Sequence, residues 1–226
     1  MDNVIELKNV SKKFRTNIIY KNINLEIEKG NCVGFVGGNG SGKSVLFQLI
    51  TGLIPIDSGK VVVNGTELGK NNCDFPQDVG ILINEPGYIS YLSGLNNLLL
   101  LAEIQNIIDE NKVRDTMLRV GLNPDDKTPV KKYSMGMKQK LGIAQAIMED
   151  QSIIILDEPY NALDFNTNIE ITKILEGLKS EGKTILLTSH QHDYMRKLCD
   201  EMYLIKEYDI VSFDEELQKD YFAYSL

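Results

Sequence analysis

A run of glycines and small polar residues ends on a lysine and a serine at residues 37–44. It follows an apolar, strand-like segment, Val33–Val36, and opens a segment with helical spacing, Val45–Ile50. Glycines let backbone N–H groups turn inward around an anion, and a helix N-terminus adds free donors and partial positive charge. The lysine can reach the β- and γ-phosphates of a nucleotide, and the serine hydroxyl can bind Mg²⁺. We therefore predict a nucleoside triphosphate site at Gly37, Gly38, Asn39, Gly40, Ser41, Gly42, Lys43 and Ser44.

Two carboxylates end a second apolar segment, where Ile153–Leu156 runs into Asp157 and Glu158. Asp157 is expected where the strand tip meets the phosphate loop, and it is predicted to bind Mg²⁺ directly or through water. Glu158 is predicted to polarise a water for in-line attack on the γ-phosphate. Taken alone, this segment is equally consistent with a buried strand that has a solvated acidic end. Beside the glycine-rich run, catalysis is the better interpretation.

The elements that position these residues alternate between strand and helix. After residue 150 the pattern predicts strands at Ile153–Asp157 and Thr184–Ser189, and helices over about residues 166–180 and 193–199. Such alternation is typical of a parallel sheet covered by helices on both faces. The N-terminal third alternates as β structure, and Asn64-Gly65 predicts a hairpin there. The fold class is therefore α/β, a P-loop NTPase core with an N-terminal antiparallel β subdomain.

The middle of the chain has helical periodicity instead. Apolar residues recur at helical spacing over Leu95–Ile108, Lys112–Val120 and Met135–Met148. We predict one domain over residues 1–226, in which residues 1–86 and 151–226 form the nucleotide-binding core. Residues 87–150 form an inserted helical subdomain.

Composition limits the partners. A net charge of −8 argues against a nucleic-acid binder, which normally presents a basic face. No apolar run reaches the roughly 18–20 residues that cross a bilayer, and the N-terminus lacks the features of a signal peptide. Cys32, Cys73 and Cys199 have no paired or metal-like spacing, so we expect free thiols in a reducing cytosol. We expect a cytoplasmic protein that reaches a membrane only through a partner.

The remaining motifs resemble the ATP-binding subunits of ABC transporters over essentially the whole chain. Tyr133–Met137 corresponds to the signature segment LSGGQ, Asn161–Asp164 to the D-loop, and Ser189-His190 to the switch histidine. All of them follow the family's order. The resemblance implies ATP and Mg²⁺ as cofactors and hydrolysis of ATP to ADP and phosphate, coupled to transport.

The resemblance also assigns roles to single residues. Ser134 and Gly136 would contact the γ-phosphate held by a second ATPase chain, so that two chains, identical or different, form an ATP-dependent dimer. His190 would contact the γ-phosphate and hold the attacking water. Phe14 would stack on adenine, with Tyr20 as the alternative.

The sequence departs from the family pattern in two places. Asn84 stands where the family normally has a glutamine, which touches Mg²⁺ and links the site to the membrane domains. Asparagine keeps the amide on a side chain that is one methylene shorter. The next residue, Glu85, is a possible substitute. Met135 and Met137 replace small or polar signature residues. At these two places the sequence resembles the subfamily that serves bacterial exporters of antibiotics, bacteriocins and lantibiotics. We therefore expect a peripheral subunit on the inner face of the cell membrane that energises export through a separate integral membrane permease.

Four apolar residues, Tyr88, Ile89, Tyr91 and Leu92, follow Asn84 closely. In this family the region forms a groove that receives a short helix of the membrane subunit, and the alternative is internal packing.

A different class of function is a soluble ABC ATPase that acts on nucleic acid or ribosomes. Its DNA-repair members carry a long coiled coil between the positions of Asn84 and Ser134, and its translation-type members fuse two such domains; neither feature is present here. A GTPase would favour Asn-Lys-x-Asp as a base reader, whereas the nearest string, Asn111–Arg114, ends in arginine.

Overall fold

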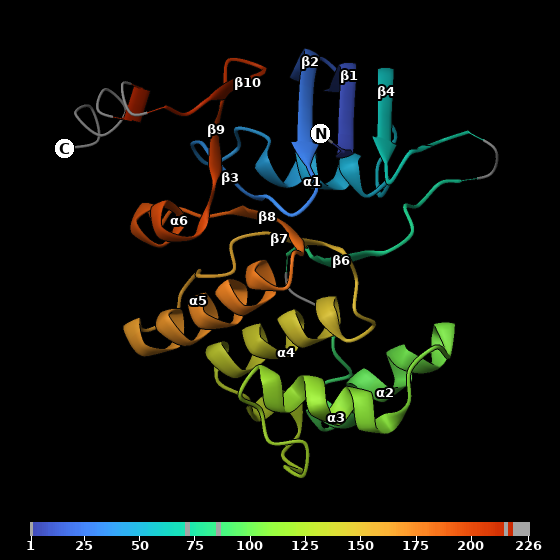
Figure 1. Ribbon diagram of the computed structural model, residues 1–226, viewed down its shortest axis with the longest axis vertical. Coiled ribbons are helices and arrows are strands. Elements are labelled where there is room, and N and C mark those ends of the chain that lie inside the picture. The colour runs from blue at the N-terminus through green and yellow to red at the C-terminus, as the bar shows by residue number, and fades with distance from the viewer. Residues whose placement is uncertain (1, 71–72, 85–86, 215–216, 219–226) are drawn as a thin grey trace.

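The computed structural model describes residues 2–70, 73–84, 87–214 and 217–218, which form layers of sheet and helix (Figure 1). The first sheet is antiparallel and has the order β2-β1-β4-β5. Its strands are β1 (Asn3–Phe14), β2 (Asn17–Glu28), β4 (Ser58–Val63) and β5 (Thr66–Glu67). Asn64 and Gly65, both at positive φ, form the predicted hairpin between β4 and β5. This sheet is the predicted N-terminal β unit.

The second sheet has the order β10-β9-β3-β8-β7-β6, and all its neighbouring strands are parallel except β9 and β10. The strands are β3 (Cys32–Val36), β6 (Val79–Leu82), β7 (Ile153–Leu156), β8 (Thr184–Thr188), β9 (Glu201–Lys206) and β10 (Asp209–Ser212). The sequence pattern identified β3, β7 and β8 and missed β9 and β10. Neither of these has the continuous apolar run that marks a fully buried strand.

Both faces of the second sheet are buried, and alternate residues of one strand therefore join different cores. Ile153 and Ile155 of β7 pack with the first sheet and with α1 (Lys43–Ile50). Ile154 and Leu156 pack with the helices on the opposite side. The phosphate-loop helix α1 thus lies between the two sheets, while the other helices cover the far face (Figure 1).

The helices on the far face form two groups. Those that follow β7 and β8 are α5 (Phe165–Ser180) and α6 (His192–Leu198). Those between β6 and β7 are α2 (Gly94–Gln105), α3 (Glu110–Arg119) and α4 (Met135–Ile147), with a short 3₁₀ turn at Val130–Lys132. Among the described residues, no helix combines the length and the apolar composition that crossing a bilayer requires.

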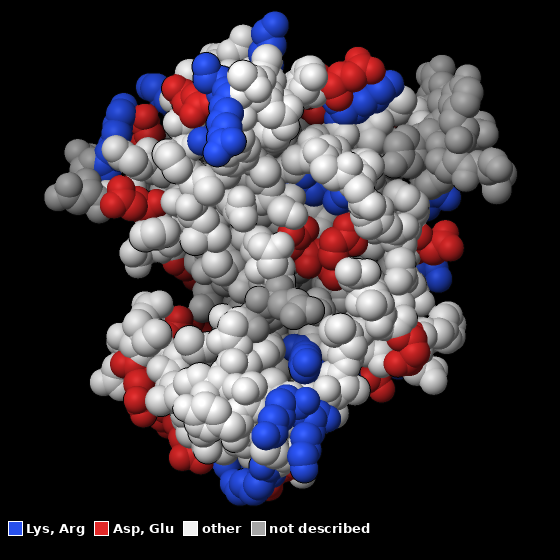
Figure 2. Space-filling model, turned by 180° about the vertical axis from the view of Figure 1, so that it is seen from behind, with Lys and Arg blue, Asp and Glu red and all other residues white. Residues whose placement is uncertain are grey.

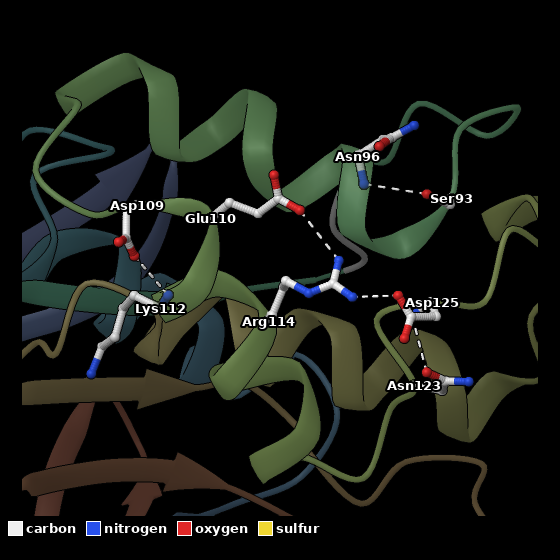
Figure 3. Close-up of polar contacts among 8 residues, drawn as sticks. All are labelled: Ser93, Asn96, Asp109, Glu110, Lys112, Arg114, Asn123 and Asp125. Carbon is white, nitrogen blue, oxygen red and sulfur yellow. Dashed lines mark hydrogen bonds and ion pairs between the residues drawn. The ribbon is translucent and has the colours of Figure 1, made fainter.

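Polar caps fix where α2 and α3 begin (Figure 3). Ser93 accepts a hydrogen bond from the Asn96 N–H at 3.3 Å, and Asp109 accepts one from the Lys112 N–H at 2.9 Å. Asn106 takes a left-handed conformation, with φ of 53°, so α2 ends at Gln105 and the expected continuation to Ile108 is wrong.

Two of the three thiols are neighbours, which their separation in sequence did not indicate. Cys32 Sγ and Cys199 Sγ lie 3.9 Å apart, and all three cysteines are free. The contact with the Cys32 thiol, together with burial, raises the pKa of the Cys199 thiol and so favours its neutral form.

Candidate nucleotide-binding site

The phosphate loop connects β3 to α1, as predicted. Gly42, the residue before α1, has φ of 112°, and a Cβ there would lie 2.9 Å from Ile19 Cγ2. Both its backbone conformation and the tight packing therefore require glycine. Lys43 is only 8% exposed, and its ammonium donates to the carbonyls of Gly37 (2.9 Å) and Gly38 (3.2 Å). The cation thus lies folded over the loop, where phosphate oxygens would meet it.

The two carboxylates lie at the tip of β7, next to this loop. Asp157 is buried, and its Oδ1 accepts a hydrogen bond from Thr188 Oγ1 at 2.6 Å. Glu158 has φ of 52°, which is uncommon for a residue with a side chain, and its N–H donates to the same Thr188 hydroxyl at 2.8 Å. The sequence analysis did not single out Thr188.

His190 contacts Glu158 twice. Its Nε2 lies 3.2 Å from Glu158 Oε1, and its backbone N–H donates to Oε2 at 3.2 Å. Burial raises the pKa of the Glu158 carboxyl, while the neighbouring His190 and Lys43 act in the opposite direction. A carboxylate with a raised pKa is a stronger base, which suits proton abstraction from water.

A hollow of about 470 Å³ brings these groups together. Its lining joins the phosphate loop, the two carboxylates and the switch histidine, which are far apart in the sequence. The lining residues are Ile19, Asn39, Gly40, Gly42, Lys43, Ser44, Val45, Asp157, Glu158, Asn161 and His190. Ile19 and Asn161 had not been predicted as nucleotide contacts, although Asn161 begins the D-loop segment.

Comparison with known proteins agrees with this geometry. The ABC transporter family model matches residues 20–161. ABC transporter ATP-binding protein YybJ of Bacillus subtilis is 38% identical over 87% of this chain and 90% of its own length. Lantibiotic transport ATP-binding protein SrtF of Streptococcus pyogenes is 34% identical over 96% and 91% of the two chains.

The chain belongs to the ABC transporter ATP-binding family.

A solved structure extends the agreement to the reaction. A dimeric ATP-binding cassette, MJ0796, in a post-hydrolysis state with ADP and Pi, is 25% identical, with a TM-score of 0.80 over 91% of this chain and 96% of that one. This ABC protein is accordingly an ATP-binding subunit with ATPase activity. The comparisons do not favour the soluble ATPase that acts on nucleic acid or ribosomes.

The signature segment of this ABC subunit lies away from its own nucleotide hollow. Ser134 caps α4 by accepting from the Met137 N–H at 3.2 Å, and neither Ser134 nor Gly136 lines the hollow. A Cβ at Gly136 would lie 2.8 Å from Thr167 Cγ2, so close packing on α5 is one reason for glycine here. Met135 is 45% exposed and lines a different hollow.

The residues predicted to contact adenine differ in their surroundings. Phe14 ends β1, is 45% exposed and has the Lys12 ammonium 5.1 Å from its ring centre, although it does not line the hollow. Tyr20 is 1% exposed and donates to the Gly42 carbonyl at 2.9 Å. Tyr20 as the alternative adenine platform is therefore wrong, because its ring is enclosed in the core.

Asn84 lies just beyond β6, is exposed and has φ of 60°, a conformation that asparagine tolerates better than most residues. It does not line the hollow. Glu85, its possible substitute, lies outside the described residues.

Proposed function

We propose that this ATPase energises export of an antimicrobial peptide or a drug through a separate integral membrane permease. The convergence of Lys43, Asp157, Glu158 and His190 on one hollow carries the proposal, since it unites phosphate binding with a base for water. Export is supported by two relatives, the lantibiotic transport protein SrtF and the bacitracin transport protein BcrA of Enterococcus faecalis; the latter is 34% identical over 97% of this chain and 73% of its own length.

The chemistry follows from the roles proposed for each group. Lys43 and the loop N–H groups bind the phosphates, Phe14 supports adenine, and Glu158 accepts the proton of the attacking water while His190 holds that water against the γ-phosphate. Ser134 and Gly136 of a second chain complete the site from the other side.

Magnesium fits the oxygen donors of this hollow. The Ser44 hydroxyl and the Asp157 carboxylate both line it, and hydroxyl and carboxylate oxygens are ligands that Mg²⁺ prefers. When bound, the ion neutralises charge on the phosphates. Asn84, the third predicted ligand, is exposed and does not line the hollow.

Replacement of Glu158 by glutamine tests the catalytic assignment. We expect kcat of Glu158→Gln to fall by at least about 100-fold, because the amide cannot accept the proton. The affinity for ATP stays within about threefold, since the phosphate contacts remain. Gel filtration with ATP should then reveal an accumulated dimer.

Glu103→Gln, an exposed carboxylate on α2, is the control and should hydrolyse ATP at the wild-type rate. Wild-type turnover in Glu158→Gln would contradict the assignment.

We further infer that the predicted helical subdomain, residues 87–150, transmits the chemistry to the permease. Tyr88 donates its hydroxyl to the Lys138 carbonyl of α4 at 3.0 Å, and the Lys131 N–H donates to the Ser90 carbonyl at 2.9 Å. Tyr88 is thereby bonded directly to the helix that carries the signature, and Ser90 to the turn that precedes it. A movement at Asn84 would therefore reach Ser134.

The same segment borders a surface suited to a docking partner. A hollow of about 180 Å³ is lined by Tyr88, Ser90, Val130, Lys131, Met135, Lys138 and Gln139. Tyr91 nearby in sequence is 71% exposed and Ile89 is 38% exposed. Figure 2 shows Lys and Arg side chains gathered over the helices in the lower half of the molecule, so apolar and basic groups adjoin there.

Docking on the permease would hold the subunit at the inner face of the membrane. Co-purification of the chain with an integral membrane protein encoded beside it tests this localisation. Recovery of the chain with ribosomes instead would support the alternative function.

A further inference from the structure

One buried hydroxyl lies between the two carboxylate residues of the site. Thr188 is the last residue of β8, and its side chain is fully enclosed, with 0% exposure. Its Oγ1 donates to Asp157 Oδ1 at 2.6 Å and accepts from the Glu158 N–H at 2.8 Å. A single oxygen therefore contacts the side chain of one residue and the backbone of the next.

The direction of these bonds is fixed by chemistry. A backbone N–H can only donate, so the hydroxyl must accept from Glu158, and its one proton is then free to point at Asp157. In this state the hydroxyl has no rotational choice left. It sets the orientation of the Asp157 carboxylate and the position of the Glu158 peptide together.

Glu158 needs such a restraint more than most residues do. Its φ of 52° lies in the left-handed region, which side chains disfavour and which persists only where the surroundings enforce it. The Thr188 bond holds the peptide of Glu158 in that conformation, and the conformation directs the carboxylate to His190.

The segment beyond His190 is tied to the same region. The Gln191 side chain donates to the Tyr160 carbonyl at 3.0 Å and accepts from Asn168 Nδ2 at 2.9 Å. Thr188 before His190 and Gln191 after it are thus both bonded to the chain at Glu158–Tyr160. The distance between His190 and Glu158 is consequently fixed by the ends of two neighbouring strands, β7 and β8.

We propose that Thr188 is a positioning residue for ATP hydrolysis, which holds Glu158 and Asp157 in register with His190. The inference rests on the roles proposed above for Glu158 and Asp157. It assigns to Thr188 a large effect on turnover and only a small one on the affinity for ATP, because Thr188 does not line the nucleotide hollow and reaches the Mg²⁺ ligands only through Asp157.

Thr188→Val tests the proposal, since valine keeps the shape and removes the hydroxyl. We expect kcat to fall by about 10- to 100-fold through misplacement of Glu158, with KM for ATP within about threefold of wild type. Thr188→Ser keeps the hydroxyl and should recover most of kcat.

Thr184→Val is the matched control. Thr184 begins the same strand, is 1% exposed, and its hydroxyl accepts from the Gly30 N–H at 2.9 Å. It loses a similarly enclosed hydroxyl at the other end of β8, away from the carboxylates, so its kcat should stay at the wild-type value even if its melting temperature falls.

Other outcomes overturn the proposal. These are wild-type kcat in Thr188→Val, a loss that appears in KM alone, or an equal loss of kcat in Thr184→Val. If Thr188→Val does not fold, Thr188→Ser and Thr188→Ala, which differ by one oxygen, replace it, and equal turnover in that pair overturns the proposal.

Glu158→Gln, measured in parallel, distinguishes failure of the catalytic role proposed for Glu158 from failure of the positioning role proposed for Thr188. Activity in Glu158→Gln removes the catalytic role of Glu158 and this inference with it. Inactive Glu158→Gln beside fully active Thr188→Val removes only the inference.

Discussion

The phosphate loop and the signature segment are both predicted to contact ATP, yet the fold treats them differently. Lys43 is 8% exposed and bonded within its own loop, and it lies in a hollow together with Asp157, Glu158 and His190. Ser134 is exposed, caps its own helix by accepting from the Met137 N–H, and lines no part of that hollow. One chain therefore assembles the binding half of the site, whereas the signature half is presented at its surface. This difference predicts that variants of the first segment impair binding, and variants of the second impair only a step that needs two chains.

Loss of the Lys43 ammonium should have the largest effect on ATP binding. We expect Lys43→Ala to weaken MgATP binding by about 10- to 100-fold, the usual range for a lost hydrogen bond to a charged group. Calorimetry on the isolated chain measures this directly. Lys60→Ala, an exposed lysine of β4, should bind as wild type does. Unchanged affinity in Lys43→Ala would contradict the claim that the phosphate loop of one chain binds the nucleotide.

A charge at Ser134 tests whether the signature segment contacts the nucleotide of a second chain. Aspartate and asparagine both cap helices well, so Ser134→Asp and Ser134→Asn should each preserve α4. The added carboxylate would face the γ-phosphate of the other chain. We expect Ser134→Asp to lose at least about tenfold in ATPase rate and to form no ATP-dependent dimer, because like charges repel strongly across an interface.

Neither Ser134 variant should change the affinity of the isolated chain for ATP. Weaker binding by the monomer in Ser134→Asp would mean that the signature contacts its own nucleotide, contrary to the comparison.

Tyr91 separates chemistry from coupling. It is 71% exposed, while Leu92 is partly buried, so Tyr91 can be truncated with less risk to folding. Tyr91→Ala should leave basal ATPase activity within about twofold and weaken association with the permease by at least about tenfold, as for exposed aromatic anchors at interfaces. Phe75→Ala removes another exposed aromatic, at 59% exposure, and should leave association intact.

The smallest effect is expected for an ion pair between two other regions, the predicted helical subdomain and the predicted nucleotide-binding core. Arg119 of α3 and Glu181, just past α5, lie 2.6 Å apart and are 36% and 47% exposed. Solvent screening limits such pairs to about 0.2–1 kcal/mol, so Arg119→Ala should change the free energy of unfolding in urea by no more than this. ATP affinity should not change. A double-mutant cycle with Glu181→Ala isolates the pair, and a coupling well above that range would mean that the regions are more rigidly joined than the exposure of these side chains implies.

The parallel core was predictable because its strands are continuous apolar runs bounded by glycine-rich or acidic turns, as in Ile153–Leu156. The strands β9 and β10 were missed because their residues mix polar and apolar types. The end of α2 was misjudged because the left-handed Asn106 interrupts an apolar pattern that itself continues to Ile108. For Tyr20, the sequence alone could not distinguish a ring enclosed in the core from one that faces a base.

Local chemistry lies in the sequence itself. The glycines and lysine of the phosphate loop, the paired Asp157 and Glu158, and the order of the family motifs needed no coordinates, because each depends on residue types at short spacing. Other features depend on residues brought together from distant strands. The Thr188 hydroxyl reaches Asp157 and Glu158 only because β8 pairs with β7, and Cys32 meets Cys199 only across the packed core. The exposure of Ser134, outside the hollow that contains Lys43, is likewise set by how α4 packs, since a helix cap gives no indication in sequence of which molecule it will face.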